Sequence, residues 1–541
     1  MREITQPDLR GDLHTTTVCV VGGGMAGLCA AIASARTGAK TLLLHDRPVL
    51  GGNASSEIRM WICGAHGKHN KETGILEELQ LENLHRNPDR NFFVWDSVLW
   101  AHATFQPNLT LLLNTAVIDA DREDGHIARL RAWQLTSQTR ITVEAEFFID
   151  CSGDSILAAA TGARHRIGRE ARAEFGEGIA PTLGDERTMG NSLLIQLHKT
   201  DRPQPFTPPQ WAFRFDAPED PPPRLPHRIR GVHAANFWWL ELGGHRDTLS
   251  HAESIRDDLV RAAYGVWDYI KNRAPERDRA ACWALHFLGS LPGKRENRRI
   301  VGDHILTQHD IEAGGTFPDV VGYGGWSMDD HHPAGLLFPG EPTIFHPAPS
   351  PYGIPFRCLY SVDTPNLLMA GRNISATHSA MSSTRVMATC AVLGQAAGTA
   401  AALCARHSVS PRRLHAQHLA ELQQTLMDDD CWLPGKLRLP HDRWFEARLS
   451  DTGENAEALL DGWERDRENA PHAWTCDPGG HVTFQWNRTL TFPGLRLVLD
   501  SNLNHDKRMA CEYPQPNHGS ALPGDLARDI DLLIDNGAGA W

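Results

Sequence analysis

The sequence has 541 residues, of which 41% are hydrophobic and 22% charged, a composition that excludes an intrinsically disordered chain and a collagen. The 53 Lys and Arg residues against 66 Asp and Glu residues give a formal net charge of −13, which argues against nucleic acid or an anionic membrane as the main partner. No apolar run approaches the roughly 18 residues of a membrane span, and residues 1–17 lack the apolar core of a signal peptide. With eleven cysteines scattered singly, we expect a cytoplasmic protein with free thiols.

The first elements predict a β-α-β unit. Residues 17–21 form a short apolar run of the kind found in buried parallel strands, and an alanine-rich stretch at 28–37 is typical of a helix. Residues 40–44 follow as a second strand. This order of elements is the one that a dinucleotide-binding fold requires.

Three glycines join the first strand to the helix at the spacing G-x-G-x-x-G. Gly22 permits a tight turn, Gly24 lets a pyrophosphate approach the backbone, and Gly27 allows close packing of helix and strand. The first N–H groups of the helix, those of Met25 and Ala26, would face the phosphates. Because both flanking elements are present, we predict a dinucleotide site.

The position after the second strand departs from this pattern. An acidic residue is expected there to bind the ribose hydroxyls, but the sequence has His45, followed by Asp46. A neutral imidazole accepts only one hydrogen bond. Either Asp46 takes this role or the ribose is held more loosely.

A second glycine motif follows in residues 51–57, GGNASSE, where Gly51 and Gly52 let the chain pass closely over the ribityl and phosphate part of a cofactor. Here the sequence resembles FAD-dependent oxidoreductases of the glutathione-reductase-like two-dinucleotide-fold type. The resemblance is to a large bacterial family with GGN-A-SSE and GR-x-x-SATH motifs, and it covers about residues 16–404. It implies FAD as cofactor. The further FAD contacts it implies are Asn53, Ser56, Ala116, Val117, Ser152, Gly153, Asp154, Gly371, Arg372, Val386 and Met387.

The resemblance also implies two candidate catalytic residues. His378 would lie in a loop beside the isoalloxazine, where a histidine of ordinary pKa, about 6.5, could accept a hydroxyl proton. With 28 histidines in the chain, a structural role stays open. Arg385 would begin the last helix and stabilise negative charge on the reduced flavin. Pairing of Arg385 with a carboxylate is the alternative.

Two charged clusters remain. The run DDHHP at 329–333 contains metal-ligand types but lacks further ligands at a suitable spacing, so we predict no metal site. We take His332 as a polar residue lining the substrate cavity and as the next catalytic candidate after His378. The run RENRR at 295–299 could bind an anion, but we favour a solvated charged stretch.

These elements predict an α/β fold with four segments. A Rossmann-like FAD-binding domain is formed by 1–160 and 291–410, with an inserted α+β substrate region at 161–290. Nine prolines between 203 and 226 predict an irregular excursion there, and 383–404 predicts a long helix. Residues 411–541 would form a helical linker and a β-rich, galactose-binding-like module with strands at 481–486 and 494–499.

The function expected is that of an FAD-dependent oxidoreductase. We expect hydride transfer from an alcohol carbon, of a sugar or sugar derivative, to flavin N5. A flavoprotein monooxygenase and a carbohydrate-binding protein with a vestigial flavin site are the alternatives. The sequence does not specify the electron acceptor or whether the chain forms a homo-oligomer, and we expect neither nucleic acid nor a membrane as partner.

Overall fold

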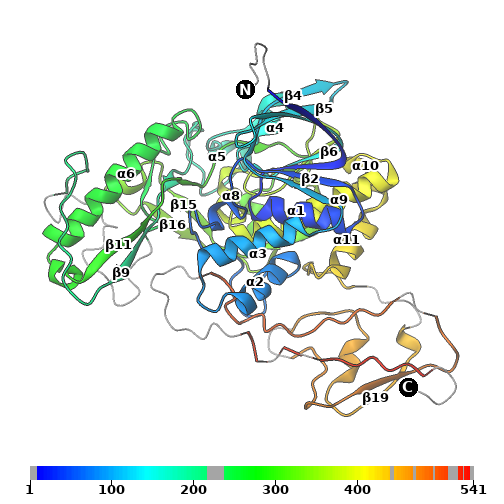
Figure 1. The fold of residues 1–541 in the computed structure, drawn as a ribbon. Coiled ribbons are helices and arrows are strands. Elements are labelled where there is room, and N and C mark those ends of the chain that lie inside the picture. Colours follow the sequence, from blue (N-terminus) through cyan, green and yellow to red (C-terminus); the bar gives the residue numbers. More distant parts are fainter. Residues whose placement is uncertain are drawn as a thin grey trace, which may run out of the picture.

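The computed structural model describes residues 9–215, 237–438, 444–466, 471–491, 494–509, 522–524, 526–527 and 529–535. Residues 216–226 of the predicted proline-rich excursion and parts of the predicted C-terminal module therefore lie outside the described residues. Figure 1 shows three parts: a layered α/β domain, a lobe around α6 (Ala252–Asp268), and an extended C-terminal part next to α2 (Ile75–Arg86).

The α/β domain is built on a parallel sheet. β1 (Gly11–Val21) lies between β2 (Thr41–Leu44) and β6 (Thr139–Asp150), with β3 (Leu109–Leu112) beyond β2 and β18 (Leu367–Met369) beyond the end of β6. All these neighbours run parallel. The predicted first strand is confirmed, and its apolar end is buried because both faces of the sheet are covered: Val18 and Val20 lie in one apolar cluster, and Cys19 and Val21 lie in another.

An antiparallel meander extends the sheet. β4 (Thr115–Glu123) pairs with β5 (His126–Gln134), which pairs with the first half of β6. Residues 109–123 form two strands, because Asn114 adopts a left-handed conformation (φ 53°) between β3 and β4. That break moves the chain from the parallel edge of the sheet to the meander.

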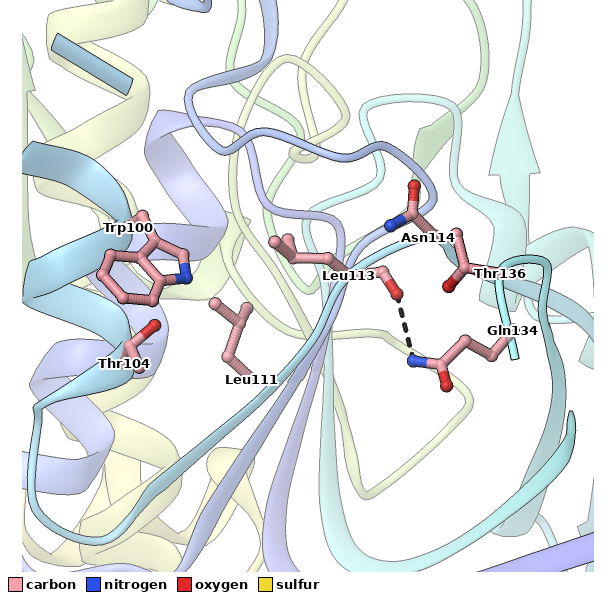
Figure 2. A pocket seen from close by; sticks show the side chains of 7 residues that line it. All are labelled: Trp100, Thr104, Leu111, Leu113, Asn114, Gln134 and Thr136. Carbon is pink, nitrogen blue, oxygen red and sulfur yellow. Dashed lines mark hydrogen bonds between the residues drawn. The ribbon is translucent and has the colours of Figure 1, made fainter. Parts of the chain in front are cut away.

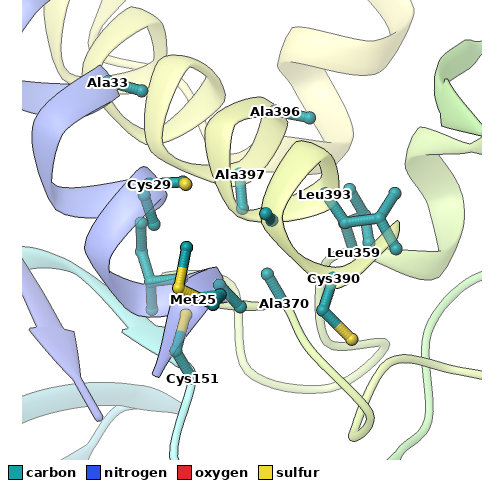
Figure 3. Close-up of a cluster of buried hydrophobic side chains, with 14 of the residues drawn as sticks. Met25, Cys29, Ala33, Cys151, Leu359, Ala370, Cys390, Leu393, Ala396 and Ala397 are labelled. Carbon is teal, nitrogen blue, oxygen red and sulfur yellow. The ribbon is translucent and has the colours of Figure 1, made fainter. Parts of the chain in front are cut away.

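The central helix pair is α1 (Met25–Arg36) and α9 (Met387–His407), whose small residues bring the two backbones into contact (Figure 3). A Cβ atom added to Gly394 would lie 2.0 Å from the carbonyl oxygen of Ala26, and one added to Gly398 would lie 2.0 Å from that of Ala30. Only glycine fits at both positions.

The helix α9 corrects the statement that no apolar run of the sequence approaches the length of a membrane span. By length and composition, α9 is long and apolar enough to cross a membrane. However, 94% of its apolar window is buried inside the protein, as expected of a core helix.

The helix predicted at 383–404 is two helices. α8 (His378–Thr384) ends at Arg385, and α9 begins after Val386, whose extended conformation breaks the helical path. α10 (Pro411–Gln417) and α11 (Leu419–Asp428) then pack on α9, with Leu414, Leu422 and Leu433 fully buried in the same core. The α/β domain therefore continues to about residue 433 and does not end at 410.

Two further helices belong to this domain: α3 (Phe92–Thr104) packs near α1 and α2, and α4 (Ile156–Thr161) follows β6. In the lobe, α6 packs near the antiparallel pair β9 (Ile195–Lys199) and β11 (Trp283–Leu288) (Figure 1). The remaining short elements are β7 (His165–Arg166), α5 (Arg172–Phe175), β8 (Asn191–Ser192), β10 (Glu241–Leu242), β12 (Gly293–Lys294), β13 (Arg299–Ile300), α7 (Gln308–Glu312), β14 (Val320–Gly324), β15 (Met328–His331), β16 (Thr343–His346) and β17 (Tyr352–Pro355).

The C-terminal part is poorer in strands than expected. In the part described, β19 (Arg448–Asp451) and β20 (Val482–Gln485) form a two-stranded sheet, which agrees with the strand predicted at 481–486. Residues 494–499 are not in a strand, and their apolar side chains Leu495, Leu497 and Leu499 are exposed. The strand predicted there is wrong because its hydrophobic alternation finds no partner sheet in the described residues.

Candidate functional site

The predicted cofactor segments meet at the carboxyl edge of the parallel sheet. The N–H of Gly22 donates to the carbonyl of Leu44 (2.9 Å), and that of Cys151 donates to the carbonyl of Val21 (2.8 Å). The N–H of Ala370 donates to the carbonyl of Asp150 (3.2 Å). Ligands of open α/β sheets bind in the crevice outside this edge.

The structure around the three glycines of the first motif differs from one position to the next. Gly22 has a left-handed φ of 103°, and a Cβ there would lie 2.4 Å from the Cys151 carbonyl oxygen. A Cβ on Gly27 would lie 1.7 Å from the carbonyl oxygen of Gly22. Gly24 differs, because its φ is −65° and a Cβ would meet no atom nearer than 3.9 Å. The protein itself does not require glycine at 24, which agrees with space kept for a ligand.

His45 is not available to a cofactor, contrary to the prediction. It is buried, its Nδ1 accepts a hydrogen bond from the N–H of Gly23 (2.9 Å), and its Nε2 lies 3.0 Å from the carbonyl oxygen of Val49. Burial and nearby Arg47 lower the pKa of His45 to about 4, so the ring is neutral. His45 thus supports the glycine turn, whereas the Asp46 carboxylate is exposed.

The second glycine motif lies against the first. The N–H of Gly51 donates to the carbonyl of Gly23 (2.8 Å), and the loop continues through Gly52 in a left-handed conformation. Asn53 and Ser56 make protein contacts here: the Asn53 amide donates to the carbonyl of Lys294 (3.2 Å), and the N–H of Ser56 donates to the carboxylate of Asp96 (3.0 Å). These two residues hold the loop in place.

The meander and strand-end segments also lie at this edge. The N–H of Thr115 donates to the carbonyl of His45 (2.7 Å), which places Ala116 and Val117 beside the end of β2. Asp154 binds Lys294 and Arg372, each at 2.7 Å. The ion pair between Asp154 and Arg372 joins the turn containing Ser152 and Gly153 to the loop that begins with Gly371.

The residues present fit FAD. No side chain caps α1 or α9, so the N-terminal N–H groups of α1 and of α9, where Val386 and Met387 lie, can face a ligand. Buried polar atoms with no hydrogen-bond partner in the described structure accompany the closing segment: Arg372 Nε, Asn373 Oδ1, Ser379 Oγ, Thr384 Oγ1 and Arg385 Nε. Buried polar groups are nearly always paired, so these atoms indicate a polar ligand.

His378 lies between two carboxylates. It is the first residue of α8, not part of a loop, and is buried. Its Nδ1 is 3.0 Å from both Glu296 oxygens, and its Nε2 is 3.1 Å from Asp330 Oδ1. Burial alone would lower its pKa, but Glu296 and Asp330 outweigh burial and raise it to about 10.

This protonation state corrects the prediction of a general base. An imidazolium that donates from both nitrogens cannot accept a proton at neutral pH. The expected pKa near 6.5 is therefore wrong. The reason is that the two carboxylates come from segments far from His378 in the sequence, Glu296 being 82 residues away.

The run 295–299 is buried, not solvated as predicted. Arg295, Glu296, Asn297 and Arg299 are each at most 2% exposed. Arg299 binds Glu296 and also Glu170 (3.0 Å). The backbone N–H of His378 donates to Glu170 as well (2.8 Å). These charges compensate one another, which is what permits their burial.

A second group of charges surrounds Asp329, the residue before Asp330. Nδ1 of His331 is 2.6 Å from Glu241, and its Nε2 is 3.1 Å from Asp329. Arg385 donates to the carboxylate of Asp329 (3.2 Å). Burial opposes ionisation of Asp329, but His331, Arg385 and Arg295 outweigh it and lower its pKa to about 2. Arg385 therefore precedes α9 and pairs with a carboxylate, as in the alternative left open above.

His332 lies outside these charge groups. Its ring stacks on Phe338, with centroids 3.7 Å apart, and its Nδ1 accepts a hydrogen bond from the N–H of Ala334 (3.2 Å). The neighbouring residues Asp329, Asp330 and His331 carry the charges that analysis of the sequence missed. The DDHH run was the sequence signal for these charges, but it was considered only as a possible metal site.

A separate pocket of about 340 Å³ lies between α3 and the start of the meander (Figure 2). Figure 2 shows the Gln134 amide donating to the carbonyl of Leu113 (3.2 Å). The residues that line the pocket are Trp100, Thr104, Leu111, Leu113, Asn114, Gln134 and Thr136. None of them is titratable and none is a predicted cofactor contact, so we assign no chemistry to it.

Comparisons with known proteins address the class. No curated protein matches the chain. Among solved structures, a geranylgeranyl bacteriochlorophyll reductase-like protein from Thermoplasma acidophilum is 14% identical, with 78% of this chain and 85% of that chain covered and a TM-score of 0.33. The myxobacterial chondrochloren halogenase CndH is 13% identical, with coverage of 77% and 80% and a TM-score of 0.35. L-proline dehydrogenase from P. horikoshii is 14% identical with a TM-score of 0.18, over 27% of this chain and only 24% of that chain.

The profile of the FAD dependent oxidoreductase family matches residues 17–426. This range includes the end of β1, both glycine motifs, the His378 cluster and α9. The chain belongs to this family. Its cofactor is FAD, and it is an oxidoreductase with a Rossmann-like α/β fold.

Proposed function

We propose that this oxidoreductase is a dehydrogenase that acts on a hydroxyl-bearing carbon of a small molecule of the carbohydrate class. The observation that carries the proposal is the carboxylate of Asp330. Its side chain is 23% exposed, whereas those of His378 and Glu296 are 4% and 0% exposed. Asp330 is thus the member of the Glu296–His378–Asp330 chain that a substrate can reach.

Oxidation of an alcohol removes a hydride from carbon and a proton from oxygen. Bound FAD supplies the two-electron acceptor. Asp330 accepts the proton, and its lowered pKa, which results mainly from the bond to His378 prevailing over burial, keeps it ionised at neutral pH. A weak base is sufficient, because a hydroxyl becomes strongly acidic as its carbon loses a hydride. We therefore assign the role of general base to Asp330 and not to His378.

His378 and Glu296 position this base. Glu296 is fixed by Arg299 and by the N–H of Met189 (2.9 Å), and it binds Nδ1 of His378. His378 can then donate from Nε2 to one oxygen of Asp330 only. Such a chain orients the carboxylate before substrate arrives, which lowers the cost of reaching the reactive geometry.

The carbohydrate class is supported by two unpaired donors beside β15, the strand that carries Asp330. Trp326 lies two residues before β15, its indole stacks on His66 with centroids 4.3 Å apart, and its Nε1 has no partner among the described residues. Nε of Arg385 is likewise unpaired. A polyhydroxyl molecule offers acceptors to both donors and an apolar face to an aromatic ring.

The test is anaerobic bleaching of bound flavin with a panel of sugars and simple alcohols. Asp330→Asn should slow bleaching by the best substrate by about 10²–10⁴-fold while FAD content is unchanged. Asp119→Asn, at an exposed ion pair on β4, is the matched control and should react like the parent. Equal rates in parent and Asp330→Asn would refute the assignment of the base.

The same panel separates the other functions. Bleaching by NADH or NADPH alone, followed by substrate hydroxylation in air, would indicate a monooxygenase. Sugar binding without bleaching by any compound would indicate a carbohydrate-binding protein whose flavin is vestigial. Either result replaces the dehydrogenase proposal.

A further inference from the structure

Three potential metal ligands meet at the far end of α9. His407 is the last residue of α9, His418 lies between α10 and α11, and Glu421 is in the first turn of α11. Nε2 of His407 is 2.8 Å from Glu421 Oε2, and Nδ1 of His418 is 3.5 Å from the same oxygen. All three ligand atoms lie within 4.8 Å of one another.

These separations suit one transition-metal ion. Zinc binds histidine nitrogen and carboxylate oxygen at about 2.0–2.2 Å, so neighbouring ligands of a tetrahedral ion lie roughly 3–3.5 Å apart. Two imidazoles and one carboxylate are also ligand types that zinc and its neighbours among the divalent transition metals accept. Water would complete the coordination shell.

The present ring orientation requires one adjustment. The two imidazoles are stacked, with centroids 3.9 Å apart and planes 14° from parallel, and a single ion cannot lie in both planes. One ring must turn about its Cβ–Cγ bond. Each histidine side chain is 28% exposed, so both rings can be reached from solvent. Arg406 approaches the other carboxylate oxygen, Oε1, at 3.7 Å and leaves Oε2 to the ion.

We propose that His407, His418 and Glu421 bind a divalent transition-metal ion of the zinc class, which fastens the end of α9 to α11. At about 1.5 Å per residue, the 21 residues of α9 place this site roughly 30 Å from the first turn of the helix. The ion is therefore structural and takes no part in the oxidation. No metal site was expected from the sequence, because only the run 329–333 was considered as one.

The experiment uses the full-length, untagged protein after removal of metal with a chelator. Titration with Zn²⁺ by calorimetry should show one strong site, and Co²⁺ should give the visible absorption of a low-symmetry nitrogen and oxygen site. Saturating Zn²⁺ should raise Tm by at least about 2 °C, because the ion binds the folded state alone.

His418→Gln and Glu421→Gln should each weaken the strong site by at least tenfold and abolish the rise in Tm. His415→Gln is the matched control: His415 is on α10, is equally exposed, and faces Asp319 (3.5 Å). It should bind Zn²⁺ like the parent. Absence of a strong site in the parent, or equal loss in all three variants, overturns the proposal. Equal binding in all of them also overturns it, because the ion then binds elsewhere.

Discussion

At the residue scale, His378 owes its charge to the two carboxylates that hold it. Its folded-state pKa of about 10 lies above its ordinary value of 6.5. The contribution of the charged His378 imidazole to the free energy of unfolding is therefore fully present below about pH 6.5 and is lost as the pH rises through about 10. Denaturant unfolding of the parent and of His378→Asn from pH 6 to 10.5 should show the parent losing stability relative to the variant. A constant difference over this range would contradict the assigned charge.

Gly24 and Gly27 should respond differently to the same substitution. Gly24→Val should fold, because its φ suits any residue and its Cβ would meet no atom nearer than 3.9 Å, but it should lose FAD because the side chain fills the expected pyrophosphate position. The purified variant should be colourless with a Tm close to that of the parent stripped of FAD. Retention of FAD by folded Gly24→Val would refute the site.

Gly27→Val is the contrasting variant. Its Cβ would collide with the carbonyl oxygen of Gly22 inside the turn, so the turn itself cannot form as it does now. We expect little soluble protein. A stable Gly27→Val variant that lacked FAD would mean that the turn tolerates the side chain and that the two glycines act alike.

At the element scale, the contact between α1 and α9 depends on missing side chains. Gly398→Ala places a methyl group 2.0 Å from the carbonyl oxygen of Ala30, and the two helices must separate. Overpacking of this kind costs about 1–3 kcal/mol. Thermal unfolding should show a lower Tm. Gly494→Ala, where a Cβ meets nothing within 4 Å, should leave Tm unchanged.

How much the sequence predicts also depends on the element. The β-α-β unit was predictable because its signals, an apolar run and glycines at fixed spacing, are local to residues 17–44. The division of the last helix at Val386 was not, since nothing in the residue types there stops a helix. The charge of His378 was not predictable either. It depends on Glu296 and Asp330, which only the completed fold brings near.

At the scale of the whole molecule, the C-terminal part is attached by buried charges. Lys507 and Glu77 are each at most 5% exposed and form an ion pair at 3.0 Å, and Arg465, also buried, donates to the carbonyls of His69 and Lys71. Removal of one partner leaves an uncompensated charge, which costs about 3–5 kcal/mol.

Lys507→Met should therefore lower the free energy of unfolding strongly, and Lys507→Met combined with Glu77→Gln should lower it less. Urea unfolding of the four members of this double-mutant cycle measures the coupling. Additive losses would mean that the C-terminal part contributes no buried pair. Truncation after residue 433, where the α/β domain ends, should remove this pair too and give a less stable protein that keeps every predicted FAD contact.

The pairing of α1 with α9 also sets an order of events during synthesis. The ribosome completes α1 at residue 36, but the helix that covers it begins at residue 387. In between, the nascent chain carries an apolar helix whose eventual partner has not been made, and such surfaces attract chaperones and aggregate when left uncovered. Both helix ends at which we expect FAD to bind are present only after α9 docks. We therefore expect the cofactor to be loaded only after residue 407 has been made, so that a shortage of FAD would be felt late in the folding of the α/β domain.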